Sequence, residues 1–528
     1  MKKYWREGEP MVWATGAALT LTLMIAATLI IVVMVNGLGV FWPKNLTLVT
    51  LKSGSRVLGE VVQREATASG EGERLQFKIG NRDLYGLDFR WVDEADFEKT
   101  ELPEAAMVLE RQEYGNFYGM LQSVSAPGFE ASSSQALEQL MEQVAIKKQG
   151  LEEFTEKIND LNRRTSKLEH QKQILFHDDP QKNQDAIAAL DRQVEALRGE
   201  FEHLVNRQTE AAVELHHYTA TFSDVNGTQK TMQATEIVRY YQPNTMNVFE
   251  KGLLYLARVV ELFIDDPRES NTEGGLFPAI FGTVMLIFLM SLFSFPLGVI
   301  AAVYLREYAK DGTAVRLVRI AVNNLAGIPS IVYGIFGLGF FVYGIGSGID
   351  QIFFPERLPT PTFGTGGILW ASLTLALLTV PVVIVATEEA LGAIPTGIRE
   401  GSLALGSTKF QALVRILLPM ASPGIMTGLI LAMARAAGEV APLMITGVVK
   451  LAPALPLDGT FPFLHLDRKF MHLGFHIYDI AFQSPNVEAA KPMVYVTTLL
   501  LVLIVLLMSS VAIHLRNKMK KRYTYGTF

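Results

Sequence analysis

The chain has 528 residues, of which 49% are hydrophobic and 19% are charged, and its formal net charge is −6. A length above about 300 residues predicts more than one domain, and the mild net charge indicates no nucleic-acid partner. The absence of cysteine excludes disulfides and thiolate metal sites. Apolar residues are concentrated in the first forty positions and from residue 275 onward, with a charged block between.

Six apolar segments are long enough to cross a bilayer, because a hydrocarbon core of about 30 Å needs about 20 apolar residues in a helix. They are residues 12–35, 276–304, 325–347, 366–387, 421–447 and 493–515. The first follows Lys2, Lys3 and Arg6, as in a signal peptide, but it is longer than the usual apolar region of one. No small-x-small cleavage site follows before Pro43. We therefore interpret this segment as a retained membrane anchor.

Lys and Arg in the short loops predict the orientation, because such residues stay on the cytoplasmic side. Basic residues occur at the N-terminus, in two loops and in the tail RNKMKKR. The two loops carry Arg306, Lys310, Arg316 and Arg319, and Arg399, Lys409 and Arg415. The loop at 348–365 carries only Arg357. Both termini are therefore expected in the cytoplasm, and residues 44–270 outside it.

The charged block is expected to contain a β domain, at about 46–125 and 216–242. LQFKIGNRDLYGLDFRW alternates apolar residues with a period of two around a Gly-Asn-Arg-Asp turn, which is typical of a β-hairpin. LKSGSRV and QEYGNFYG look like further hairpin turns. Strand-like pieces return at YTATFSD and TEIVRYY, separated by an Asn-Gly turn.

Apolar residues between these pieces alternate by three and four, the spacing of a coiled-coil seam. The seam has a few polar breaks and runs through Leu137, Leu140, Val144, Lys147, Leu151, Phe154, Ile158, Leu161, Thr165, Leu168, Lys172 and Leu175. It resumes after HDDPQK at Ile187, Leu190, Val194, Leu197, Phe201 and Leu204. We expect an antiparallel coiled-coil hairpin at about 135–215, with arms of roughly 55 Å. Its pattern fits equally a docking arm for an external partner and a rigid spacer or packing arm.

The segment EGSLALGSTKFQALVRILLP, residues 400–419, is too polar to cross a bilayer yet lies between two spans. Leu403, Phe410, Leu413, Ile416 and Leu417 can form an apolar stripe on two short helices. Gly406 would supply the break between them, and Pro419 suits the first turn of the next helix. An amphipathic helix pair of this kind is suited to a partner's groove.

The segment resembles the coupling loop of importer-type ABC permeases, which has Glu-Ala-Ala, three residues, Gly, nine residues and Ile-x-Leu-Pro. The matching positions here are Glu400, Gly401, Ser402, Gly406, Ile416, Leu418 and Pro419, with Gly and Ser where Ala is usual. LREYA, NNLAGIPSIVYGIFGLG and ARAAGEVAPLMITG likewise resemble the permease subunits of phosphate-specific ABC importers. The resemblance covers 275–528 closely and 1–40 loosely, and leaves out the block at 44–270.

The resemblance implies an α-helical polytopic membrane protein with six transmembrane helices in the type I ABC importer permease fold. Residues 1–43 would hold the first span, 44–270 the periplasmic insertion, and 271–528 the permease core with a cytoplasmic coupling loop at 388–420. The expected function is ATP-driven import of inorganic phosphate across the bacterial inner membrane. The expected partners are a sister permease subunit in a heterodimer, two cytoplasmic ATP-binding subunits, a periplasmic phosphate-binding protein and the lipid bilayer.

The chain lacks G-x-x-x-x-G-K-[ST], so ATP and Mg are expected to be used by the partner ATPase, and this subunit is expected to be no enzyme and to bind no cofactor. Two alternatives stay open. One keeps the mechanism and changes the anion to phosphonate, sulfate or molybdate. The other is a membrane scaffold or sensor that uses the external coiled-coil arm.

Arg435 and Glu439 are expected on one helical face inside the fifth span. A charge at bilayer depth costs about 2.5–3.5 kcal/mol, so such residues usually face a pathway or a protein interior. We expect Arg435 to meet the anion, and Glu439 either to hold Arg435 in position or to limit how tightly the anion binds. The alternative is a buried structural pair between helices. Asn324 and Ser330 belong to a polar, helix-breaking start of the third span that suits either a pathway wall or a kink. His472 and His476 lack nearby carboxylates, so no metal site is expected.

Overall fold

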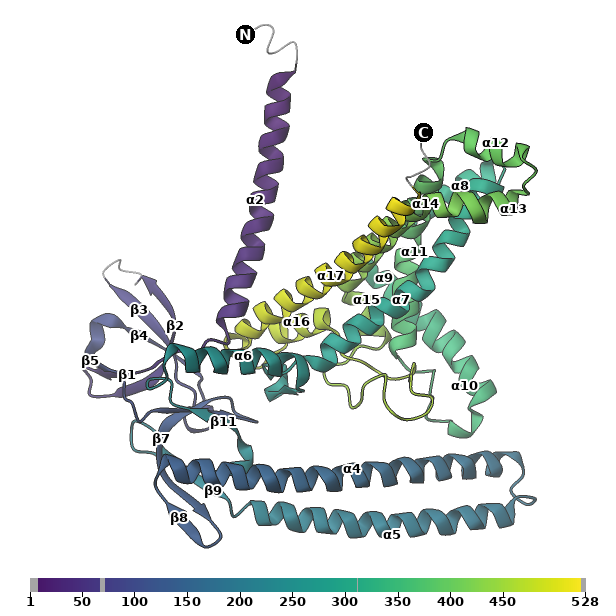
Figure 1. The fold of residues 1–528 in the computed structure, drawn as a ribbon. Coiled ribbons are helices and arrows are strands. Elements are labelled where there is room, and N and C mark those ends of the chain that lie inside the picture. Colours follow the sequence, from purple (N-terminus) through teal and green to yellow (C-terminus); the bar gives the residue numbers. More distant parts are fainter. Residues whose placement is uncertain (1–7, 67–71, 311, 524–528) are drawn as a thin grey trace. The chain divides into compact units, whose positions relative to one another are not determined.

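The structure is a computed structural model that describes residues 8–66, 72–310 and 312–523 (Figure 1). Lys2, Lys3 and Arg6, which contribute to the predicted orientation, lie outside the described residues. The chain forms two compact units. The helical unit comprises Met1–Val40, Leu262–Pro267 and Gly275–Phe528, and the β unit comprises Phe41–Glu261 and Arg268–Gly274.

The described part of the helical unit contains six helices long and apolar enough to cross a membrane. They are Met11–Gly39, Phe277–Tyr308, Ser330–Phe353, Ile368–Gly392, Lys409–Ala437 and Val487–Lys521. This agrees with the six predicted spans, but the fifth differs from the predicted 421–447. It begins twelve residues earlier and ends at Ala437, so residues 438–447 are not part of it.

The other helices of this unit are short and lie between or beside the spans. The bounds of the elements are α2 (Glu9–Gly39), α7 (Phe277–Val303), α8 (Thr313–Leu325), α9 (Ser330–Phe336), α10 (Ser347–Phe353), α11 (Ile368–Gly392), α12 (Thr396–Ala404), α13 (Lys409–Ala412), α14 (Leu418–Ala437), α15 (Ala441–Thr446), α16 (Leu473–Phe482) and α17 (Val487–Tyr523). Stretches of π-helix at Tyr304–Tyr308, Gly337–Gly346 and Leu413–Leu417 continue α7, α9 and α13.

Helices α7, α11 and α14 pack closely because small residues face one another at their contacts. A Cβ added to Gly298 of α7 would lie 2.6 Å from the Cβ of Val383 in α11. A Cβ on Gly424 or Gly428 of α14 would lie 2.5 Å from the methyl group of Ala390 or Ala386. Helices in a membrane associate through such close packing, because lipid supplies no hydrophobic force between them.

The β unit contains two antiparallel sheets. The first has the order β4-β3-β2-β1-β5 and the second β10-β9-β7-β6-β11, with β8 paired to β7. Their strands are β1 (Leu46–Leu51), β2 (Arg56–Ala66), β3 (Glu73–Lys78), β4 (Phe89–Asp93), β5 (Phe97–Glu101), β6 (Met107–Arg111), β7 (Phe117–Ala126), β8 (Phe129–Ala131), β9 (Thr219–Ser223), β10 (Gln229–Gln233) and β11 (Ile237–Tyr241).

The predicted hairpins are present, with two differences. β3 pairs with β4, but the connection is longer than the predicted turn and contains the one-turn helix α3 (Arg82–Tyr85), so Leu87 is exposed rather than in a strand. The Asn-Gly turn joins β9 to β10, a strand that the sequence reasoning missed. β11, predicted to follow that turn, pairs with β6 instead.

Two long helices, α4 (Ser134–Asp178) and α5 (Gln184–Leu215), are inserted between β8 and β9 and lie antiparallel to each other (Figure 1). Ion pairs from Lys147 to Glu214 (2.7 Å) and from Arg198 to Glu169 (2.9 Å) join the two helices. At the base of the pair, Leu137, Leu140, Val144 and Leu215 are buried in the core of the second sheet. The helix pair is therefore rooted in the β unit rather than merely attached to it.

The chain leaves the β unit through α6 (Val248–Ile264) and returns briefly as the short strands β12 (Pro267–Arg268) and β13 (Glu273–Gly274) before α7 begins. The sequence reasoning assigned no structure to this stretch.

Candidate functional site

The predicted coupling segment begins where α11 ends and forms a helix, a turn and a second helix. The turn passes through Gly406, whose φ is +86°, a left-handed conformation that L-residues rarely adopt. A Cβ at this position would meet nothing within 4 Å. Glycine is therefore favoured by its backbone conformation and not by a close approach of neighbouring atoms.

Side chains within the segment fix the shape of this turn. The Ser402 and Ser407 hydroxyls lie 2.6 Å apart, and the Ser407 hydroxyl also donates to the Ser402 carbonyl (2.6 Å). Thr408 and Gln411 form a reciprocal capping box at the start of α13, an arrangement that satisfies two otherwise unpaired backbone N–H groups. Ser402 thus has a structural role, whereas Glu400 and Gly401 beside it are exposed.

The second helix of the segment does not end before the span, which corrects the predicted pair of separate short helices. α13 continues through a π-helical turn at Leu413–Leu417 into α14. Pro419 therefore lies inside a continuous helix rather than at the start of a new one. Proline donates no backbone hydrogen bond, and the irregular turn directly before it places this missing donor where the α-helical pattern is already interrupted.

The apolar residues of the segment separate into two groups. Leu413 and Leu417 are buried against Leu391 and Ile394 at the end of α11, and Ile416 and Leu418 are half-buried. Leu403, Phe410 and Leu405 are exposed, Leu405 to 91%. These exposed side chains are available to a partner. The sequence reasoning missed Leu405, because this residue lies outside the predicted apolar stripe.

An ion pair that sequence reasoning also missed connects this segment to α7. Arg399 of α12 donates to a carboxylate oxygen of Glu307 (3.0 and 3.2 Å) and to the carbonyls of Ile394 (2.7 Å) and Leu391 (2.5 Å). One guanidinium therefore links α12, the end of α11 and the π-helical end of α7. Arg399 and Glu307 lie 92 residues apart, so no local spacing indicates that they meet.

Arg435 and Glu439 do form an ion pair, with Nε and Oε1 3.7 Å apart, but they do not share a helix. α14 ends at Ala437, and Glu439 lies in the break before α15. Our expectation of one helical face inside the fifth span is therefore wrong. The breaking residue is Gly438, and Arg435 occupies the last turn of α14, where the helix dipole favours a positive charge.

A second break faces the first. Residues 326–329 separate α8 from α9, and the Arg435 guanidinium donates a long hydrogen bond (3.5 Å) to the carbonyl of Ala326 in this break. The helices that follow the two breaks also meet, since a Cβ on Gly334 of α9 would lie 2.7 Å from the Cα of Pro442 in α15. Arg435 is thus held between two interrupted helices, with its side chain a third exposed.

The two other predicted pathway residues flank the second break. Asn324 is exposed near the end of α8, and Ser330 is half-buried at the start of α9. Within the described ranges, no hydrogen bond joins either residue to the Arg435–Glu439 pair. Asn324 and Ser330 therefore lie on either side of the break that Arg435 contacts, but they are not members of the ion pair.

The histidines considered in the sequence have structural contacts. His472 is buried at the start of α16, where its Nδ1 accepts from the backbone N–H of Gly474 (3.1 Å). His476 is buried with its Nδ1 3.2 Å from the Thr497 hydroxyl.

Comparison with known proteins places the similarity in the helical unit. Residues 294–521 match the family described as "Binding-protein-dependent transport system inner membrane component". A probable phosphate transport system permease protein PstA of Methanocaldococcus jannaschii is 33% identical over 247 residues, covering 46% of this chain and 75% of that protein. The phosphate transport system permease protein PstA of Yersinia pestis is 34% identical over 246 residues, covering 47% of this chain and 74% of that protein.

A solved structure of the MetNI methionine ABC transporter in an inward-facing conformation is 20% identical and covers 46% of this chain and 95% of that chain, with a TM-score of 0.35.

Proposed function

Because this chain belongs to the family of binding-protein-dependent transport system inner membrane components, we propose that it is the permease subunit of an ATP-driven importer of inorganic phosphate. The assignment to phosphate rests on the relatives that match the helical unit, because both are named as phosphate transport system permease proteins. They favour phosphate over phosphonate, sulfate or molybdate. The observation in the structure that supports a pathway is the cation Arg435 held between two helix breaks, in the last turn of an apolar helix.

ATP hydrolysis would be carried out by two separate cytoplasmic subunits, which would bind ATP and Mg. Their docking surface would be the exposed face of 400–410, made of Glu400, Gly401, Leu403, Leu405 and Phe410. Ile416, Leu418 and Pro419 would carry movement of this surface into the span, because α13 and α14 form one continuous helix. The ion pair between Arg399 and Glu307 would transmit the same movement to α7.

The remaining partners follow from the same proposal. A sister permease would complete the pathway as a heterodimer, and a periplasmic phosphate-binding protein would deliver the anion. Both termini would be cytoplasmic and 44–270 periplasmic, as the basic loops indicate. The α4–α5 pair would then act outside the membrane as a coiled-coil arm or spacer.

In the pathway, Arg435 would offer guanidinium donors to the phosphate oxygens, a geometry that Arg provides and Lys does not. Glu439 would hold the guanidinium through its single, long contact, which a passing anion can replace. Asn324 and Ser330 would line the approach on either side of the second break. The pair of breaks supplies polar backbone groups that are tolerable at membrane depth only against protein or water.

The test compares phosphate uptake with membrane abundance in the same cells. Arg435→Ala is expected to lower uptake about tenfold or more, because it removes a charge-assisted hydrogen bond worth about 1.5–3 kcal/mol. Arg435→Lys is expected to lower uptake less. Arg435→Ala also strands Glu439, so the deciding variant is Arg435→Ala with Glu439→Ala. Normal abundance without uptake in the double variant supports the proposal. Uptake near wild type in a well-expressed double variant would show that the pair is only structural.

A further inference from the structure

Helix α6 has one face that is tied to the β unit by polar contacts. Arg258 donates to Glu110 (Nε to Oε1, 3.0 Å), to the carbonyl of Phe41 (3.0 Å) and to the Tyr241 hydroxyl (2.5 Å). The Tyr255 ring lies against Phe41 and Trp42, with ring centroids 6.3 and 6.2 Å apart. This face is therefore fully occupied by the chain itself.

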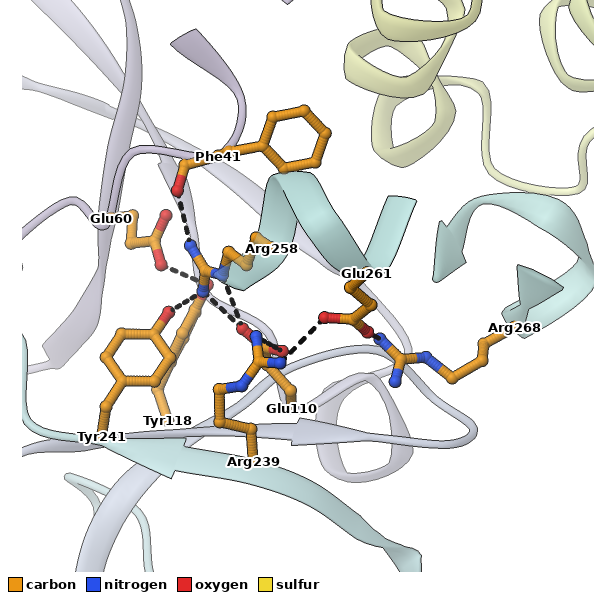
Figure 2. Close-up of polar contacts among 9 residues, drawn as sticks. All are labelled: Phe41, Glu60, Glu110, Tyr118, Arg239, Tyr241, Arg258, Glu261 and Arg268. Atoms are coloured by element: carbon orange, nitrogen blue, oxygen red, sulfur yellow. Dashed lines mark hydrogen bonds and ion pairs between the residues drawn. The ribbon is translucent and has the colours of Figure 1, made fainter. Parts of the chain in front are cut away.

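Figure 2 shows how these contacts extend into a chain of alternating charges. Arg239 of β11 joins Glu110 of β6 (3.4 Å) to Glu261 of α6 (2.8 Å), and Glu261 also accepts from Arg268 (2.6 Å). Burial by itself would lower the pKa of Arg258, but the neighbouring Tyr241 and Glu110 outweigh burial and raise it. The guanidinium is thus charged at every physiological pH, and α6 cannot rotate without breaking several partly buried ion pairs.

The opposite face of α6 is an apolar stripe without a partner in the described chain. It comprises Phe249, Leu253, Leu256, Val260 and Phe263, which are between 41% and 74% exposed. Their spacing of four, three, four and three places them on one side of the helix. The charged residues of α6 lie off the stripe: Lys251, Arg258 and Glu261 contact Asn45, Glu110 and Arg239, and Glu250 accepts from the backbone N–H of Asn247. A contiguous exposed stripe of this kind marks a surface that something apolar covers.

The chain connections of α6 indicate what covers it. Tyr255 and Arg258 contact residues 41 and 42, which directly follow the first apolar span. At its other end, Leu262 accepts from the backbone N–H of Leu276 (2.8 Å), and Asp265 accepts from that of Phe277, the first residue of the second span (3.3 Å). A Cβ on Gly275 would lie 2.0 Å from the Asp265 carbonyl oxygen, so these segments are in direct contact. α6 thus contacts the residues that follow the first span, and its C-terminal end contacts the residues at which the second span begins.

We propose that α6 is an interfacial helix whose apolar stripe is buried in lipid, at the headgroup–acyl boundary of the leaflet where the first span ends and the second begins. Helices that lie in this boundary present an apolar face with a polar face opposite and sink about 5–10 Å into it. α6 has 17 residues and so runs for about 25 Å along the surface. Because its polar face is bonded to the β unit, α6 would hold that unit at the bilayer surface, in addition to the chain connections between the β unit and the spans.

Nitroxide labels on the full chain in liposomes test this inference, since the chain has no native cysteine. Single cysteines would replace Leu253, Leu256 and Val260, and accessibility to oxygen, which partitions into lipid, would be compared with accessibility to a water-soluble nickel chelate. Phe288→Cys, at an exposed position of α7, is the lipid control, and Leu87→Cys, at an exposed position of the β unit, is the water control.

The expected result is an oxygen-to-nickel ratio at the three α6 positions close to that at position 288 and several-fold above that at position 87. A ratio like that of position 87 would place the stripe in water and overturn the proposal. Low accessibility to both reagents would show that a second copy of the chain covers the stripe, which overturns it equally. Neither outcome bears on phosphate transport, so this test and the uptake test fail independently.

Discussion

Gly406 illustrates how one residue can be required for its backbone conformation alone. Its φ is positive, and the space around its Cα is open. A Cβ there meets no neighbour within 4 Å, so the direct cost of substitution is the left-handed conformation itself, about 1–2 kcal/mol for most L-residues. Asparagine adopts this conformation more readily than other non-glycine residues.

We therefore expect Gly406→Asn to retain coupling and Gly406→Leu to weaken it, although both add a side chain at the same place. The measurement is the amount of ATPase subunit that co-purifies with each variant, together with its phosphate-stimulated hydrolysis. Equal impairment of the two variants would indicate that side-chain volume at the docking surface matters instead.

At the scale of elements, Arg399 fixes the position of α12. Its guanidinium donates to Glu307, to the carbonyl of Leu391 in the last turn of α11 and to the carbonyl of Ile394, just past the end of that helix. Carbonyl groups at a helix C-terminus have no partner within the helix. The same side chain therefore serves as a C-terminal cap for α11 and as the link to α7.

Arg399→Ala is expected to lower the local stability of α12 by about 1–2 kcal/mol, which corresponds to roughly 5–30-fold faster amide exchange in residues 396–405. Glu307→Gln should have a smaller effect, because the carbonyl contacts of Arg399 remain. Hydrogen exchange on the full chain measures both. Arg316→Ala, at an exposed position of α8, serves as the control. Unchanged exchange in Arg399→Ala would show that burial of Leu413 and Leu417 suffices to hold the segment.

At the scale of the whole molecule, the α4–α5 pair can be divided into a base and a distal part. The base contributes Leu137, Leu140, Val144 and Leu215 to the core of the second sheet. The distal part is held by contacts between the two helices, which include Ile158, Leu161 and Val194 as buried residues. The two parts should therefore respond differently to deletion.

Replacing residues 156–207 by a short Gly-Ser loop should leave both units folded, because the base remains and Thr155 and Gln208 already lie within hydrogen-bond distance (2.8 Å). Deleting 135–215 should instead unfold the β unit, since it removes buried leucines that cost about 2–5 kcal/mol each when truncated. Protease resistance of the β unit in the purified full chain distinguishes the two. Equal resistance after both deletions would contradict the assignment of the base to the core.

Properties that depend on local sequence could be predicted without the structure. The six spans follow from the length and apolarity of continuous segments, and the two long helices α4 and α5 follow from apolar residues at spacings of three and four. The positive φ of Gly406 follows from the kind of residue that a break between helices requires. In each case the residues that carry the signal are neighbours in the chain.

The tertiary structure alone decided which distant groups meet. Nothing in the sequence brings Ala326 to Arg435 or Glu307 to Arg399, because these partners lie 109 and 92 residues apart. The end of α14 at Ala437 was missed because residues 421–447 are predominantly apolar despite Arg435 and Glu439, and hydropathy does not distinguish a continuous helix from a broken one. The stripe on α6 has a clear period, yet only the structure shows that its polar face is occupied and its apolar face free. Periodicity tells which side of a helix is apolar, whereas the partner of each side is set by how the whole chain packs.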